Sequence, residues 1–282
     1  MPLHDILLHL DAYPEATPPE AINQAVRFVA ALGGVLSAIA VEVDIQPPKN
    51  RLADYLIGLS HMAAEEERKS RGFCTATLET FTSKAREAGV VGEAIHAKAE
   101  LYAVGAYVAE RCRTRDLCIV PVAYQSDGQR AVVEAVAFGS GRPVLTFCPG
   151  GSDLPLSGLD TVVLAWDGSR TAARAMADAM PILRTAREVT VLTVTNDKAS
   201  TRSGSGQDVV RHLGTHGVSA VAEEIDRDGR QIGFVFSDYI SATRPGLFVM
   251  GAYGHSRARE FVLGGATEHM IHHLPAPLLL SH

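Results

Sequence analysis

Residues 247–269 read LFVMGAYGHSRAREFVLGGATEH. The four apolar residues at the start of this stretch, 247–250, predict a buried strand. Gly251 follows the strand, Gly254 comes three residues later, and Gly264 and Gly265 precede a new helical segment. Glycine lets backbone N–H groups approach an anion closely, and a helix N-terminus adds the positive end of its dipole. The spacing G-x2-G-x9-G therefore predicts a phosphate-binding loop, with plain glycine turns as the alternative.

The same order of predicted elements occurs twice along the chain. An apolar strand opens each copy, at residues 5–10 and 161–166, and an aspartate follows each strand directly, Asp11 and Asp167. Further strands are expected in matching order at residues 35–43, 90–97, 117–120 and 142–147, and again at 189–194, 218–225, 247–250 and 276–281. Helical segments separate them, so each copy predicts parallel strands with right-handed crossovers in an open α/β sheet. The proline- and glycine-rich residues 149–155 are the expected linker.

Length and composition limit the class of protein. A chain of 282 residues is expected to hold two domains of ordinary size. Its formal net charge of −6, without a Lys/Arg cluster, argues against nucleic acid as a partner. No apolar run reaches the roughly 18 residues of a membrane span, and residues 1–8 lack the pattern of a secretion signal, so a cytoplasmic protein is expected. The four cysteines lack C-x-x-C spacing, which argues against a zinc site or a disulfide framework.

Three features of the second copy resemble the universal stress protein family. They are the Asp167-Gly168-Ser169 turn after the first strand, the glycine loop after the fourth, and the closing Thr-Glu-His helix followed by Pro-Ala-Pro-Leu-Leu-Leu. The resemblance extends over both copies in order. The chain is therefore similar to a tandem member of the family, with a degenerate domain at residues 1–149 and a second domain at residues 158–282.

The resemblance also implies how the two copies are arranged. Single-domain members of the family dimerise through their final strand, so the final strands here, residues 144–147 and 278–281, should pair with each other. An exposed apolar edge strand favours such pairing on physical grounds. The expected fold is α/β, with two tandem open parallel-sheet, doubly wound domains that form an internal pseudo-twofold pair.

In the second copy, the resemblance implies an adenine-nucleotide site. Asp167 would lie at the mouth of the cleft, main-chain atoms near Val194 would contact adenine, and the backbone of Gly251, Gly254 and Gly264 would hold the phosphates. Such ligands bind at the carboxyl ends of strands in open α/β sheets. The implied ligand is ATP, with or without Mg²⁺, while AMP, ADP or an empty cleft remain open.

Neighbouring residues complete this candidate site. His255, Ser256 and Arg257 add hydrogen-bond donors and positive charge to the glycine loop, which suits a triphosphate. The alternative is that they only solvate an exposed turn. The next helix opens with the remaining candidates, which are Gly265, Ala266 and Thr267.

One departure from the family pattern weakens the expected site. Nucleotide-binding members usually carry Ser or Thr directly after the last loop glycine, where this chain has Gly265. The loss of one hydrogen bond to a charged group predicts binding weaker by about 1.5–3 kcal/mol, roughly one to two decades in affinity. Thr267 could supply a substitute hydroxyl only if the helix began later, and a helix-start role is expected for it instead.

The first copy departs further from the pattern. Aligning Leu117 with Leu247 puts Pro121 where the second copy has Gly251, and Tyr124 where it has Gly254. Proline removes an N–H donor, and tyrosine brings a bulky side chain where close backbone approach is needed. Nucleotide binding is therefore expected in the second copy only.

A long helix is expected at residues 51–88 of the first copy. Its apolar positions at helical spacing predict a stripe that faces the core: Leu52, Tyr55, Leu56, Leu59, Met62 and Ala63. The charged residues 65–69 predict a solvated face, with a partner surface or the recruitment of a second chain as the alternative. His269, His272 and His273 have helical spacing but no carboxylate or cysteine partner at a recognisable spacing, so no metal site is expected.

Three functions remain open from the sequence. The first is a stress-responsive protein that binds ATP at one site in its second domain and acts as a regulator. The second is a nucleotide-free scaffold that acts through an unidentified protein partner. The third is an enzyme, at most a slow ATPase or a nucleotide- or flavin-using relative, although no catalytic residue can be assigned and neither a Walker lysine nor a G-x-S-x-G elbow is present.

Overall fold

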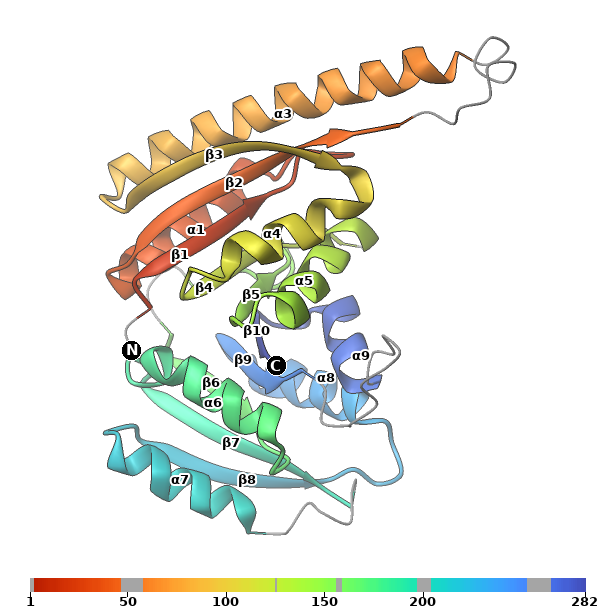
Figure 1. The fold of residues 1–282 in the computed structure, drawn as a ribbon. Helices are drawn as coiled ribbons and strands as arrows, with labels where there is room; N and C mark the ends of the chain where they lie inside the picture. Colours follow the sequence, from red (N-terminus) through yellow and green to blue (C-terminus); the bar gives the residue numbers. More distant parts are fainter. Residues whose placement is uncertain (1–2, 47–57, 125, 156–158, 197–203, 253–264) are drawn as a thin grey trace.

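The computed structural model describes residues 3–46, 58–124, 126–155, 159–196, 204–252 and 265–282. Within these residues the strands form one ten-stranded sheet in the order β3-β2-β1-β4-β5-β10-β9-β6-β7-β8 (Figure 1). The first half contributes β1 Asp5–Leu10, α1 Pro19–Leu32, β2 Val35–Asp44, α3 Leu59–Glu87, β3 Val91–Glu100, η1 Leu101–Ala103, α4 Val104–Cys112, β4 Leu117–Pro121, α5 Asp127–Gly139 and β5 Val144–Phe147. The second half contributes β6 Thr161–Ala165, α6 Arg170–Leu183, β7 Glu188–Thr195, α7 Ser205–Thr215, β8 Ala220–Asp226, α8 Ile232–Thr243, β9 Leu247–Gly251, α9 Gly265–His273 and β10 Leu278–Ser281.

The two halves meet at the only antiparallel pairing among these strands. Each half is parallel within itself, as alternating strands and helices predict. At the seam, β5 and β10 run antiparallel, with Leu279 opposite Leu145. The strand order of the first half is therefore repeated in reverse by the second. This confirms the expected α/β fold of two open parallel sheets in a pseudo-twofold pair.

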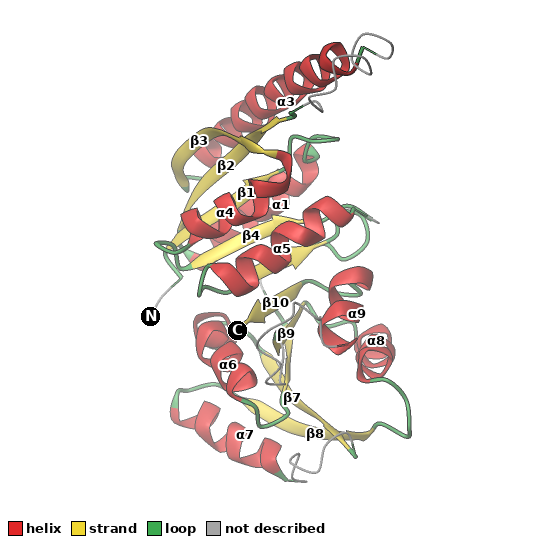
Figure 2. Cartoon of the chain, turned by 45° about the vertical axis from the view of Figure 1, so that its right-hand side comes forward, coloured by secondary structure: helices red, strands yellow, loops and turns green. Residues whose placement is uncertain are grey.

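Helices cover both faces of the sheet (Figure 2). One apolar core lies between the sheet and α1, α3, α6 and α7, and the other lies between the sheet and α4, α5, α8 and α9. Alternation along the strands divides the side chains between these cores: Ile6 and Leu8 of β1 enter the first core, and Leu7 enters the second. Both cores continue across the seam, so each half helps to bury the other.

The segment after β5 is anchored to the first half. Gln24 of α1 donates from Nε2 to Asp153 at 2.6 Å and accepts the N–H of Leu154 at 3.1 Å. The side chain of Leu154 is buried in the core. The residues expected to be a linker thus pack as part of the fold, because α1 supplies both a donor and an acceptor to them.

Helix α3 differs from its prediction. It spans Leu59–Glu87, and the part of the predicted helix at residues 51–57 lies outside the described residues. Met62, expected to face the core, is 57% exposed, whereas Cys74, Phe81 and Ala85 are buried. The expectation for Met62 was wrong because the N-terminal part of α3 extends past the end of the sheet (Figure 1), where few apolar neighbours are available. The charged residues that follow Met62 pair with one another, as in the 2.6 Å contact of Lys69 with Glu66.

Candidate functional site

Three of the predicted site residues meet at one edge of the sheet. Strand β6 lies between its parallel neighbours β9 and β7 in the sheet. The chain continues from β6 to β7 and β8 on one side of β6, and then crosses to β9 on the other side. Ligands of open α/β sheets usually bind at such a reversal of strand order. Asp167 follows β6, Val194 lies near the end of β7, and Gly251 ends β9. Because the carboxyl ends of parallel strands share an edge, the structure places all three residues at that edge.

Asp167 is held by the turn that starts α6. Its Oδ1 accepts the N–H of Ser169 at 2.9 Å, and Gly168 has a φ of +75°, which favours glycine. Ser169 then caps α6, accepting the N–H of Ala172 at 3.1 Å. The Asp-Gly-Ser sequence therefore has a structural reason of its own. It also fixes a carboxylate beside a helix N-terminus at the candidate site.

The main chain of Val194 faces the end of β6. Pairing between β6 and β7 ends with Ala165 opposite Leu192, after which Trp166 donates its N–H to the Leu192 carbonyl at 2.8 Å. Val194 is two residues further along β7, so its main-chain groups point to the same side as those of Leu192. Its side chain is buried. The backbone of Val194 is therefore directed toward the edge at which β6 ends.

Gly251 has a packing role that the sequence did not reveal. A Cβ at this position would lie 2.4 Å from the carbonyl carbon of Thr171 and 2.6 Å from the nitrogen of Ala172. Only glycine lets the end of β9 approach the first turn of α6 so closely. The glycine therefore serves the fold whether or not a ligand binds. Its consequence for the site is that the α6 N-terminus lies directly against the end of β9.

Helix α9 begins at Gly265, which is exposed. Its backbone is not in the left-handed region, and apart from its chain neighbours and the backbone of α9 no described atom lies within 4 Å of the position a Cβ would take. Ala266 is half-buried, and Thr267 is buried in the first turn, which is the helix-start position expected for it. The remaining candidates lie outside the described residues: Gly254, His255, Ser256, Arg257 and Gly264.

Comparison with known proteins identifies the second half. The model of the universal stress protein family matches residues 158–282. Residues 158–282 belong to the universal stress protein family. No curated protein sequence matches the chain significantly.

Solved structures extend the similarity to the whole chain. A universal stress protein from Archaeoglobus fulgidus DSM 4304 is 17% identical, with a TM-score of 0.68 over 98% of this chain and 95% of that one. A putative universal stress protein from Pseudomonas aeruginosa UCBPP-PA14 is 13% identical, with a TM-score of 0.58 over 99% and 93%. A third, a universal stress protein in complex with cAMP, is 20% identical, with a TM-score of 0.32 over 50% and 96%. The first two show that both halves together have the fold of one universal stress protein chain.

The first half has the same strand positions as the universal stress protein domain but a different edge. Pro121 pairs with Phe147 in β5 as Gly251 pairs with Ser281 in β10, so Pro121 is the counterpart of Gly251. The next N–H groups bond alike, Val122 to Phe147 at 2.8 Å and Ala252 to Ser281 at 2.7 Å. This confirms the predicted alignment. Tyr124 is 78% exposed.

A glutamine fills the edge of the first half. Gln129, in the first turn of α5, donates from Nε2 to Oδ2 of Asp11 at 2.8 Å and accepts the N–H of Ala123. Oδ1 of Asp11 accepts the N–H groups of Ala12 at 3.0 Å and Tyr13 at 3.4 Å. Both carboxylate oxygens are thus bonded within the protein. Nothing in the residue pattern indicated Gln129, because it lies 118 residues from its partner.

Burial perturbs two ionisable groups beside this edge. Burial raises the pKa of Asp11 to about 6, against the opposing effect of the hydrogen bonds from Gln129, Tyr13 and Ala12. Burial also lowers the pKa of His9 to about 4, and its Nδ1 has no partner within the described residues. The counterpart of His9 in β6 is Ala165, since Ile6 and Val162 occupy equivalent positions opposite Leu117 and Leu247. A buried neutral imidazole therefore replaces a methyl group in the first half.

Two histidines of α9, His269 and His273, have structural partners. His269 shares a hydrogen bond of 2.8 Å with Ser237 of α8 and stacks on His273 with ring centroids 4.0 Å apart. A Cβ on Gly233 would lie 2.5 Å from the His269 side chain, so α8 and α9 pack closely here. Burial lowers the pKa of His269, and His273 lowers it further. Among the described residues, no group of three or more histidine, cysteine or carboxylate side chains could hold a metal ion.

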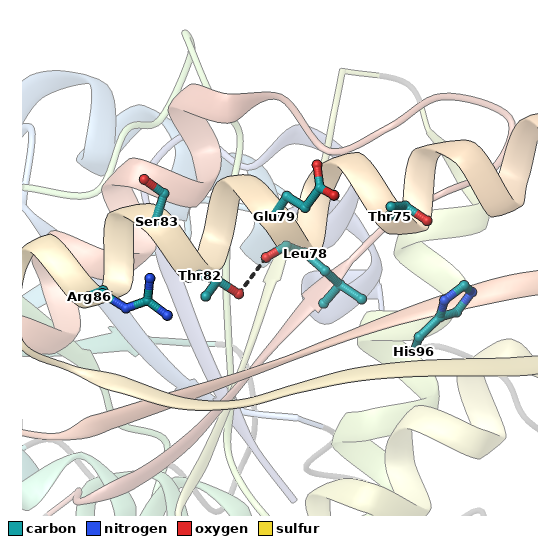
Figure 3. Close-up of a pocket in the computed structure, with 7 residues that line it drawn as sticks. All are labelled: Thr75, Leu78, Glu79, Thr82, Ser83, Arg86 and His96. Atoms are coloured by element: carbon teal, nitrogen blue, oxygen red, sulfur yellow. Dashed lines mark hydrogen bonds between the residues drawn. The ribbon is translucent and has the colours of Figure 1, made fainter.

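A shallow groove lies far from this edge, along α3 and the outermost strand β3 (Figure 3). Leu78 and Thr82 point from α3 toward β3, His96 points from β3 toward α3, and Arg86 also lines the groove. Thr82 donates to the Leu78 carbonyl at 2.7 Å, so its hydroxyl is engaged within the helix. The groove is separated from β9 by β2, β1, β4, β5 and β10. It therefore has no part in the candidate nucleotide site.

In the described part of the chain, no helix has the length and apolar character needed to cross a membrane.

Proposed function

We propose that the second half binds an adenine nucleotide, ATP in the first instance, at the edge formed by β6, β7 and β9. The observation that carries this proposal is the contact of the α6 N-terminus with the end of β9, the strand that precedes α9. Helix α6 starts directly after β6, and α9 follows β9, so both present the positive ends of their dipoles where the strands end. Packing of Gly251 against Thr171 holds the first of these helices close to β9. Phosphate groups are the ligands that such an arrangement favours.

We further propose that the loop glycines Gly254 and Gly264, with His255, Ser256 and Arg257, close over the phosphates. Membership of residues 158–282 in the universal stress protein family supports this assignment. A triphosphate would bring Mg²⁺ with it, and the ion would be bound chiefly through phosphate oxygens and water.

The proposed role is regulatory, as part of a stress response. The Asp167 carboxylate accepts a hydrogen bond in the turn that starts α6, which suits a group that orients a ligand. A catalytic role in proton transfer would instead require a side chain whose pKa is matched to that transfer. Slow hydrolysis of ATP is compatible with this role but is not needed for it.

One site per chain is proposed. In the first half, Pro121 lacks an N–H group where phosphate donors are needed. Gln129 already bonds the aspartate that matches Asp167. A ligand in this half would have to displace a buried hydrogen-bonded pair.

The two matched aspartates provide the test. Asp167→Asn keeps the oxygen that accepts the Ser169 N–H, so α6 should remain capped, while the charge at the cleft is removed. Loss of a hydrogen bond to a charged acceptor should weaken ATP binding by about one to two decades in calorimetric titration. Asp11→Asn, the same change in the first half, should leave ATP affinity unchanged. Equal affinities for the parent and Asp167→Asn, or loss of binding in Asp11→Asn, would contradict the proposed site.

A nucleotide-free scaffold is the second candidate. The exposed N-terminal part of α3, with Met62 57% exposed above a charged helix face, favours it as a surface for a protein partner. Absence of any ATP binding by the parent would support this alternative.

A further inference from the structure

A side chain of the first half reaches the helix of the candidate site. Arg130, in the first turns of α5, donates from Nη2 to the main-chain carbonyl of His272 in α9 at 3.1 Å. The Arg130 side chain is only 9% exposed, and its Nη1 pairs with Asp127 at 2.9 Å. Helices α5 and α9 lie near each other beside the seam in both views (Figures 1 and 2). The two halves are thus linked here by a buried charge as well as by the β5–β10 pairing.

The bond is made where α9 most needs a partner. Helix α9 has nine residues, and a helix of this length is marginal without tertiary support. The last carbonyls of a helix lack partners within it, and His272 is the residue before the last. A guanidinium at this end also interacts favourably with the negative end of the helix dipole. The Arg130 guanidinium therefore both donates a hydrogen bond to a free helix carbonyl and interacts favourably with the negative end of the α9 dipole.

A second residue of α5 faces the same helix. Glu134, one turn after Arg130, has a pKa raised mainly by burial; His272 acts to lower it, and Glu268 acts to raise it. Both of these side chains belong to α9. Charged groups of α9 thus act on Glu134 as well, one turn of α5 beyond Arg130.

We infer that Arg130 is a positioning residue for the nucleotide site of the opposite half. It holds α9 from its C-terminal end and so fixes where Gly265, at the other end, meets the phosphates. The inference rests on the proposed function. It also gives the first half a role: the half that lost its own phosphate glycines supports the helix that the second half uses.

Arg130→Met tests this inference, because methionine keeps much of the apolar stem and removes every donor. Two quantities should change. Hydrogen exchange of the α9 amides, measured without nucleotide, should accelerate about tenfold or more, while exchange in β6 and β7 stays as in the parent. ATP affinity should fall by about one decade, as expected for a helix that must be ordered on binding.

Two further variants separate positioning from general stability. Arg130→Lys retains a donor that can reach a carbonyl and should recover most of the ATP affinity. Asp127→Asn removes the exposed ion-pair partner but not the bond to His272, so ATP affinity and α9 exchange should match the parent. A lower melting temperature in Arg130→Met with unchanged ATP affinity would overturn the inference and leave Arg130 a stabilising residue only. Unchanged α9 exchange in Arg130→Met would overturn it as well.

Failure of the proposed nucleotide-binding function can be distinguished from failure of this inference. If the parent protein binds no ATP, the proposed function is wrong, whatever the results for the variants. In that case the exchange measurement still decides whether Arg130 orders α9, since it is made without nucleotide.

Discussion

Gly265→Ser examines the weakest point of the proposed nucleotide site. Gly265 is the first residue of α9, is not in the left-handed region, and apart from its chain neighbours and the backbone of α9 has no described atom within 4 Å of the position a Cβ would take. Serine at this position therefore requires no left-handed backbone conformation. Its hydroxyl would stand at the positive end of the helix dipole, where phosphate is expected. One hydrogen bond to a charged group contributes about 1.5–3 kcal/mol, so ATP should bind about one to two decades more tightly.

Gly265→Ala is the matched control for this change. It adds the same Cβ but brings no hydroxyl, so any change that it shares with the serine variant comes from replacing glycine and not from a new hydrogen bond. Calorimetric titration of the parent and both variants with ATP separates these effects. The Gly265→Ser variant should bind ATP more tightly than the Gly265→Ala variant by the full hydrogen-bond contribution. Equal ATP affinities of the two variants would show that the missing hydroxyl does not limit binding. Weaker ATP binding by Gly265→Ser than by the parent, with unchanged circular dichroism, would show the same.

Two other predictions concern stability. Leu279→Asp puts a charge into the fully buried seam opposite Leu145, so it should destabilise the fold by more than the about 2–5 kcal/mol that truncation of a buried leucine costs. The melting temperature should fall and X-ray scattering should show the two halves separated, whereas Leu279→Met should behave like the parent. A scattering curve and a melting temperature equal to the parent's would show that β5 and β10 are not the seam. The second is a difference in pH dependence between the parent and Asp11→Asn. Because the folded pKa of Asp11 is raised from 3.8 to about 6, its contribution to the free energy of unfolding falls by about 3 kcal/mol as pH rises through that window. His9, with its pKa lowered from 6.5 to about 4, has the opposite effect on stability, but this effect is the same in the parent and in Asp11→Asn. Urea unfolding from pH 4 to 7 should therefore show Asp11→Asn gaining stability relative to the parent as pH rises. Parallel profiles would mean that Asp11 does not titrate in this range.

Much of the fold follows from the order of strands and helices. Apolar runs such as residues 247–250, each separated from the next by a helical segment, leave few topologies open besides a parallel sheet. The antiparallel seam between β5 and β10 was also predictable, because both halves end in an apolar strand that would otherwise lie at an edge. The N-terminal part of α3 was harder. Helical spacing shows that Met62 shares a face with core residues, but not that the sheet ends before reaching it.

The candidate site could be predicted only in part. Position along the chain placed Asp167 and Gly251 at the ends of strands, and the shared edge of a parallel sheet brought them together. The contacts that decide what each half can do join residues far apart in sequence, such as Gln129 with Asp11 and Arg130 with His272. Such contacts leave no periodic signal. The close approach of Gly251 to Thr171 likewise depends on how a strand meets a helix, which residue spacing does not record.

Native mass spectrometry of the full chain titrated with ATP measures how many nucleotides each chain binds. We propose one nucleotide per chain, in the half that contains Asp167. At saturating ATP, the parent should show a single nucleotide adduct per chain, retained in Asp11→Asn and diminished in Asp167→Asn. Two adducts per chain, or none at saturating ATP, would contradict this proposal.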